Sequence, residues 1–344
     1  MNAVHQKIVD AVLEKAKREC PEALDMIGIY GSVCTGDVHE HSDLDLLVLI
    51  NDPKGYVLSK AFILEDEGIG YDIYCTSWES LTEDANCGHA HISKLMDSEV
   101  LFVRDESVTE RWENLKNQAR EVLGSDKRFD GIAGIREELC KIYGHAFVAE
   151  TIGQLRGWAA YMITLSLDAV MLWNGVYFKR GVKRTFEEME GLDIPDDFEA
   201  NVMKIVQAKN YIELGIALGT LFKSVMRFTE RRTRKDAPAK ERLTGTYEEM
   251  YSNWRNKMPE AAERGDAFAS FMNLASLQYM LEEISAENAI PRFNVLEEFD
   301  ANDLAKNAKI FDDALEDYRQ EYVKLGIEPE QFASVDEFIK AYLN

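Results

Sequence analysis

Residues 31–50 of the chain read GSVCTGDVHEHSDLDLLVLI, and this stretch decides the fold. Its right half is an apolar run, rich in leucine and valine, whose first residues include Asp43 and Asp45. Side chains at positions i and i+2 of a strand project from the same face, so we expect these two carboxylates to be neighbours in space. Two adjacent carboxylates repel each other unless a cation lies between them. The pair therefore predicts a divalent metal site.

The left half of the stretch predicts a turn. Residues 26–30 form a short apolar run typical of a buried strand, and this run leads into Gly31 and Ser32, after which we expect a turn or a short helix. Backbone N–H groups at such a junction are unpaired and suit a phosphate oxygen. A metal site beside a phosphate-binding turn favours an enzyme that acts on nucleoside triphosphates.

The order of these features resembles a known signature. Gly-Ser at 31–32, ten further residues and Asp-Leu-Asp at 43–45 are similar to the motif of the nucleotidyltransferase superfamily, which includes DNA polymerase beta and kanamycin nucleotidyltransferase. Residues 42–46 have the form found in many small bacterial members, such as the antibiotic (aminoglycoside-type) enzymes. A Gly-Ser turn or an Asp-x-Asp pair alone is weak, because both are common in ordinary turns and strand ends. Their ordered combination is specific.

The resemblance implies a third carboxylate on a neighbouring strand. The apolar run at 69–75 contains one acid, Asp72, which alternates with Tyr71 and Ile73 and can therefore face the same cleft. On this basis Asp43, Asp45 and Asp72 are the expected catalytic residues and the ligands of one or two Mg²⁺ ions.

The activity implied by the resemblance is transfer of a nucleoside monophosphate, AMP from ATP or the equivalent from another nucleoside triphosphate, to a hydroxyl of a small acceptor. Pyrophosphate would be released (an EC 2.7.7 reaction), and Gly31 and Ser32 would hold the phosphates. The general base is either Asp72 or a glutamate of the helical part, where Glu137, Glu138 and Glu150 are available.

A basic segment in the second half of the chain offers further phosphate ligands. Residues 174–184 read NGVYFKRGVKR, with four cations within six residues of an acidic protein. Members of the superfamily commonly place lysines of a helical domain on the triphosphate, so we expect Lys179 and Lys183 to bind it. The two lysines would share a face if the segment were helical. A solvated basic turn is the alternative.

The length of 344 residues is sufficient for two domains. We expect an α+β fold: a nucleotidyltransferase domain at 1–105, with a small mixed sheet flanked by helices, then an α-helical bundle at 106–344 with an exposed connection at 233–247. Strands are expected at 26–30, 43–50, 69–76 and 100–103. Helices are expected at 3–19, 56–66, from about 77, 89–96, 106–124, 131–174, 198–232, 257–286, 302–325 and 335–343.

The net charge of −23 bears on the partners. An acidic surface repels the phosphates of a polynucleotide, so long nucleic acid is not an expected substrate. A cationic small acceptor such as an aminoglycoside would be attracted to it, although acidity that only maintains solubility gives the same charge. Arg227, Arg231, Arg232, Arg234 and Lys235 form a second basic cluster, interpreted as a solvated helix end or an interdomain anchor.

Other features indicate a cytoplasmic protein, and the sequence leaves open whether it is a monomer or a homodimer. The five cysteines are scattered and fit reduced thiols, and no apolar run approaches the length of a membrane span or a signal core. Residues 87–91 read CGHAH, but a structural zinc site needs four ligands at recognisable spacing, so a helix start is preferred there.

Two alternative functions remain open. One is a toxin-like nucleotidyltransferase that modifies a protein or a tRNA. The other is a nucleotide-binding module without turnover, which the complete set of three aspartates disfavours.

Overall fold

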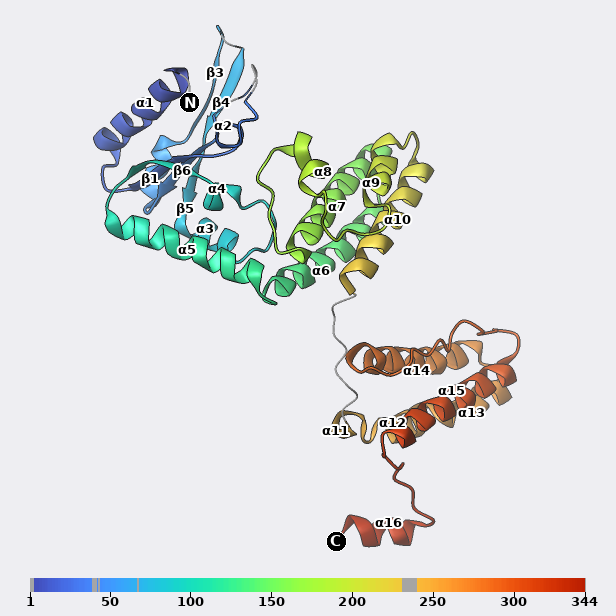
Figure 1. Ribbon diagram of the computed structural model, residues 1–344. Coiled ribbons are helices and arrows are strands. Elements are labelled where there is room, and N and C mark those ends of the chain that lie inside the picture. Colours follow the sequence, from blue (N-terminus) through green and yellow to red (C-terminus); the bar gives the residue numbers. More distant parts are fainter. Residues whose placement is uncertain (1–2, 39–41, 43, 67, 231–239, 344) are drawn as a thin grey trace. The chain divides into compact units, whose positions relative to one another are not determined.

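The computed structural model describes residues 3–38, 42, 44–66, 68–230 and 240–343 (Figure 1). The chain divides into two compact units, Met1–Arg232 and Thr233–Asn344, and each is described by itself. None of the described helices is long and apolar enough to cross a membrane.

The first unit contains a four-stranded mixed sheet in the order β5-β2-β1-β6. β1 (Leu24–Ile29) runs antiparallel to both β2 (Leu46–Ile50) and β6 (Glu99–Val103), whereas β5 (Cys75–Ser77) runs parallel to β2. Every residue of β1 and β2 is buried. A strand that is buried on both faces is apolar throughout, which explains the uninterrupted run of leucine, valine and isoleucine in β2.

Alternate residues of β2 enter two different cores. Leu46, Val48 and Ile50 pack with α1 (Ala3–Glu19) and with β4 (Ile69–Ile73). Leu47 and Leu49 belong to a larger core formed with α3 (Trp78–Ala85), α5 (Glu106–Gly124) and the helices that follow. Figure 1 shows α1 and α5 on opposite sides of the sheet. The division expected after residue 105 therefore lies within the first unit, and this larger core crosses it.

The helical remainder of the first unit comprises several long helices: α6 (Arg128–Phe147), α7 (Ile152–Trp173), α9 (Phe198–Gln207) and α10 (Tyr211–Glu230). Two short elements, η2 (Val182–Arg184) and α8 (Thr185–Glu188), follow α7. The long helical stretch expected at 131–174 is interrupted between α6 and α7. There Thr151 and Gln154 form a capping box, in which the side chain of each residue accepts a hydrogen bond from the backbone N–H of the other.

The second unit is helical and has its own core, which includes Leu274, Phe311 and Tyr318. Its elements are α11 (Lys240–Leu243), α12 (Thr246–Met250), η3 (Tyr251–Arg255), α13 (Lys257–Arg264), α14 (Ala267–Glu287), α15 (Leu304–Lys324) and α16 (Val335–Tyr342). An exposed connection was expected at 233–247. Residues 233–239 lie outside the described part of the chain, and residues 240–247 include α11 and the start of α12. The predicted α+β fold, a mixed sheet with helices followed by a largely helical region, is confirmed.

Several local predictions were wrong. The helices expected at 198–232 and 257–286 are each two helices, α9 with α10 and α13 with α14. The helix expected at 56–66 is a 3₁₀ turn, η1 (Pro53–Leu58), followed by strand β3 (Lys60–Leu64), which pairs with β4 as a hairpin. The single strand expected at 69–76 is two strands, because β4 pairs with β3 while β5 pairs with β2. The helix expected across 89–96 is confined to α4 (Ser93–Met96), since the Ala90 carbonyl accepts from the Phe178 N–H at 2.9 Å instead of from a residue one turn later.

Candidate active site

The turn after β1 has a backbone conformation that requires glycine. Gly31 has φ 68° and ψ −142°, and Ser32 begins the short helix α2 (Ser32–Thr35). This region of φ/ψ space is adopted almost only by glycine. The Tyr30 N–H donates to the Asp45 carbonyl at 3.1 Å, so the turn is tied to the residue that precedes β2.

The side chain of Asp45 occupies the space beside this glycine. A Cβ atom at Gly31 would lie 2.0 Å from Asp45 Oδ2 and 2.8 Å from its Cγ. The structure thus brings together three of the predicted site residues, Gly31, Ser32 and Asp45. Asp45 precedes β2 rather than lying inside a strand that begins at residue 43, and Asp43 lies outside the described residues.

Asp72 is on a different sheet from β2. It lies on the exposed face of β4 opposite Ala61, while Tyr71 and Ile73 are buried, as the predicted alternation requires. Beside it is a hollow of about 550 Å³, which is also lined by Phe62. β4 contacts β2, the strand that Asp45 precedes. The role of Asp72 stays a prediction.

The basic segment reaches the turn through Asp37, which follows α2. Lys183 Nζ donates to the Asp37 carbonyl at 3.1 Å. Arg184 Nη2 lies 3.3 Å from Asp37 Oδ1, and Arg180 Nε lies 3.8 Å from Oδ2. The segment between α7 and α8 is therefore held against the Gly31–Asp37 region.

Lys179 and Lys183 do not share a helical face, because helical backbone in this segment covers only residues 182–184. The Lys179 ammonium lies 5.6 Å from the centre of the Tyr177 ring. The hydroxyl of Tyr177 donates to Asp97 Oδ1 at 2.8 Å, which fixes the start of the segment near β6. Burial and the neighbouring carboxylate of Asp97 together raise the pKa of Tyr177, so it remains a neutral donor.

Asp37 is ionised in this setting. Loss of solvent acts to raise the pKa of its carboxyl group, but the hydrogen bond from the Thr35 hydroxyl opposes this effect. The positive charges of Arg180, Arg184 and Lys183 act in the same direction as that bond. The pKa of Asp37 is lowered as a result, which keeps the contact between the turn and the basic segment charged at neutral pH.

Carboxylate oxygens are ligands that Mg²⁺ prefers, and Asp45 lies against the turn at Gly31, so this donor fits such an ion. Within the described residues, no group of three or more His, Cys, Asp or Glu side chains could hold a metal together. The expected ligand set of Asp43, Asp45 and Asp72 stays a prediction, because Asp43 lies outside the described residues. The histidines of residues 87–91 pair with carboxylates instead: His89 with Asp84 at 3.3 Å and His91 with Asp168 at 3.6 Å.

Sequence reasoning did not single out Asp37, Asp97 or Tyr177. The sequence feature that pointed to such a residue is the excess of cations at 179–184, because these cations need an anionic partner. That partner lies 146 residues from Lys183 in the sequence, and no periodicity relates the two.

Residues 6–98 match the family model described as nucleotidyltransferase domain. The matched residues include the turn at Gly31, Asp45, Asp72 and Asp97. No curated protein matches the chain. Among solved structures, the chain is similar to a nucleotidyltransferase-like protein from Exiguobacterium sibiricum 255-15, with 11% identity and a TM-score of 0.37 over 75% of this chain and 92% of that one.

Proposed function

We propose that this protein is a metal-dependent nucleotidyltransferase that transfers AMP from ATP to a hydroxyl group of a small cationic acceptor and releases pyrophosphate. The observation that carries the proposal is the Asp45 carboxylate, which fills the space beside Gly31 at the turn of the matched domain. A carboxylate at this place would lie beside the phosphates that the turn would bind.

The first residues of α2 would hold phosphate oxygens. The N–H groups of Cys34 and Thr35 both donate to the Gly31 carbonyl at 3.1 Å. Those of Ser32 and Val33 have no partner in the described part of the chain, as is usual for the first N–H groups of a helix. Two adjacent unpaired donors suit an anionic oxygen, and Lys183, which contacts the Asp37 carbonyl, would add a positive charge.

Asp43, Asp45 and Asp72 would hold the metal. A bound Mg²⁺ ion supplies neutralisation of the charge that develops on the phosphate oxygens. Asp72 would either complete the ligand set or accept the proton of the acceptor hydroxyl, and its exposed position on β4 leaves it free to meet an acceptor.

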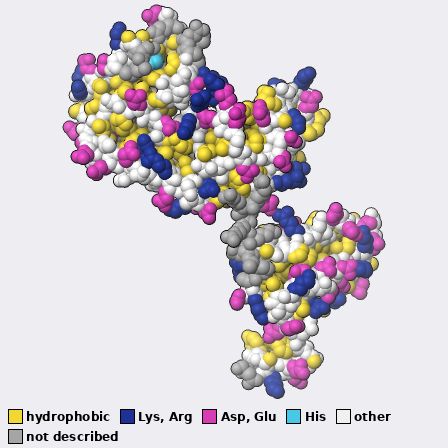
Figure 2. All heavy atoms as spheres, in the orientation of Figure 1, with side chains coloured by type: hydrophobic (Ala, Val, Ile, Leu, Met, Phe, Trp, Pro, Cys, Tyr) yellow, Lys and Arg dark blue, Asp and Glu magenta, His cyan; other side chains and the backbone are white. Residues whose placement is uncertain are grey.

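The charge of the protein supports a cationic acceptor. The net charge is −23, and acidic side chains are spread over the visible surface of the first unit (Figure 2). A negative surface potential raises the local concentration of a small polycation and lowers that of a polynucleotide.

Incubation with ATP labelled at the α-phosphate, together with Mg²⁺, tests the proposal against a panel of aminoglycosides, proteins and tRNA. We expect label on the small cationic acceptor. Asp45→Asn should lower the rate by about 10³-fold, or ~4 kcal/mol in activation free energy, because the carboxylate that faces the turn is lost. Asp66→Asn, an exposed change of the same kind after β3, is the matched control and should leave the rate unchanged. Label on protein or tRNA alone, or full activity in Asp45→Asn, would contradict the proposal.

A further inference from the structure

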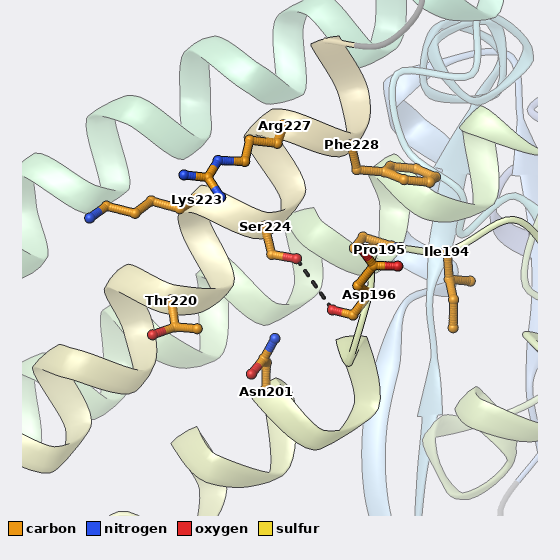
Figure 3. Close-up of a pocket in the computed structure, with 9 residues that line it drawn as sticks. All are labelled: Ile194, Pro195, Asp196, Asn201, Thr220, Lys223, Ser224, Arg227 and Phe228. Atoms are coloured by element: carbon orange, nitrogen blue, oxygen red, sulfur yellow. Dashed lines mark hydrogen bonds between the residues drawn. The ribbon is translucent and has the colours of Figure 1, made fainter.

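A second polar pocket lies in the helical part of the first unit, away from the residues of the candidate active site. It has a volume of about 390 Å³ and is formed by α9, α10 and the loop at 194–196 (Figure 3). Its lining residues are Ile194, Pro195, Asp196, Asn201, Thr220, Lys223, Ser224, Arg227 and Phe228.

One face of α10 supplies a row of donors to this pocket. Thr220 lies three and four residues before Lys223 and Ser224, and Arg227 lies four and three residues after them, which places all four on one side of the helix. Lys223 and Arg227 are exposed, and no ion pair is formed by either within the described part of the chain. In an acidic protein, two neighbouring cations without a carboxylate partner indicate a position for an external anion.

Asn201 offers a further donor to the pocket from α9. Its side chain is almost completely buried, with 5% of the residue exposed, and Lys204 Nζ donates to its Oδ1 at 3.1 Å. Because an ammonium group can only donate, this contact fixes which end of the amide is the oxygen. The NH₂ group therefore faces the pocket, and Figure 3 shows it directed toward Ser224.

This NH₂ group has no partner in the described part of the chain. It is not among the buried side-chain atoms that lack a partner in the described residues, so it reaches the open space of the pocket and is available to an acceptor there. The Ser224 hydroxyl beside it has only a long contact, 3.5 Å to the Asp196 carbonyl, and is available to the same acceptor.

We propose that this pocket binds a small molecule that carries a phosphate group on a compact apolar body. The Asn201 amide, the Ser224 hydroxyl and the cations Lys223 and Arg227 receive the phosphate oxygens. Ile194 and other apolar side chains of the lining contact the body of the ligand. The volume accommodates one phosphate ester, and the acidic protein surface disfavours a polynucleotide. This site does not depend on the proposed transferase activity.

Phenyl phosphate and inorganic phosphate are suitable probes, titrated calorimetrically into the full-length protein with a chelator present and no divalent metal. We expect phenyl phosphate to bind more tightly than inorganic phosphate, because only the former fills the apolar part of the pocket. Lys223→Met and Asn201→Asp should each raise the Kd for phenyl phosphate about tenfold, since each removes a charge-assisted or buried hydrogen bond, and Asn201→Asp also adds a repelling charge.

Two matched variants separate this pocket from other sites. Lys209→Met makes the same change of charge between α9 and α10 outside the lining, and Lys183→Met alters the proposed triphosphate site; both should bind phenyl phosphate as the wild type does. Equal affinity in all variants, or no binding at millimolar concentration, would overturn the proposal. If Asn201→Asp fails to fold, the exposed Lys223→Met variant decides the result alone.

Discussion

Replacement of Gly31 by alanine is the most direct test of the geometry at the turn. The added Cβ would lie 2.0 Å from Asp45 Oδ2, whereas an ordinary contact begins at 3.4 Å. The carboxylate must therefore move by roughly 1.4 Å, and a displacement of about 1 Å at a reacting group can cost about 10²-fold in rate. We expect Gly31→Ala to lose nucleotidyl transfer by at least this factor.

The same sequence offers a matched control five residues later. Gly36 also has a positive φ, 75°, but a Cβ at that position meets nothing within 4 Å. Gly36→Ala should therefore lose only the free energy of the left-handed backbone, about 1–2 kcal/mol, and retain its activity. Gly31→Ala has a backbone cost of about 1–3 kcal/mol, so the two variants are comparable in stability but not in activity.

The measurement is the initial rate of label transfer from ATP, taken well below the melting temperature of both variants. Thermal melting confirms that each variant is folded at the assay temperature. If Gly31→Ala and Gly36→Ala have similar rates, the position of the Asp45 carboxylate is not important for the reaction, and the assignment of this turn as the active site is refuted.

Two further predictions concern charged contacts. Lys183→Met should raise the KM for ATP about tenfold, while Lys179→Met has a smaller effect, because only the Lys183 ammonium contacts the turn region; equal effects would contradict this placement. The hydrogen bond with Asp84 raises the pKa of His89 above its usual value of 6.5, so the charged pair stabilises the fold below pH 6.5 and is lost as the pH rises through the raised pKa. The melting temperature of His89→Gln should therefore fall furthest below wild type under acidic conditions and least once the pH exceeds the raised pKa, with His145→Gln as the control. A gap that widens with pH would contradict this sign.

Local sequence patterns predicted those parts of the fold that depend on local forces. The run at 46–50 is apolar at every position because both faces of β2 are covered, and the helix at 3–19 follows from its apolar stripe. The strand at 60–64 was missed, since its alanine and leucine residues are good helix formers and its extended form depends on pairing with 69–73.

Long-range hydrogen bonds explain the other differences. Nothing near Ala90 in the sequence indicates that its carbonyl will accept from the N–H of Phe178, far along the chain, and that bond replaces the one that a helix would make there. The candidate active site shows the same contrast between local motifs and long-range contacts. Gly31 and Asp45 belong to one short motif and were predicted together, whereas the approach of the basic segment depends on Asp37, whose partners lie in the second half of the unit.

The contact through Asp37 also bears on how the proposed site would work. Arg180 and Arg184 are engaged with the Asp37 carboxylate, and Tyr177 is anchored on Asp97, so the basic segment is held beside the turn before any nucleotide binds. A segment that is already ordered has less conformational entropy to lose when a triphosphate arrives, which favours binding. In the proposed enzyme the arginines would therefore act as positioning residues, and Lys183 would be the cation that is brought to the phosphates.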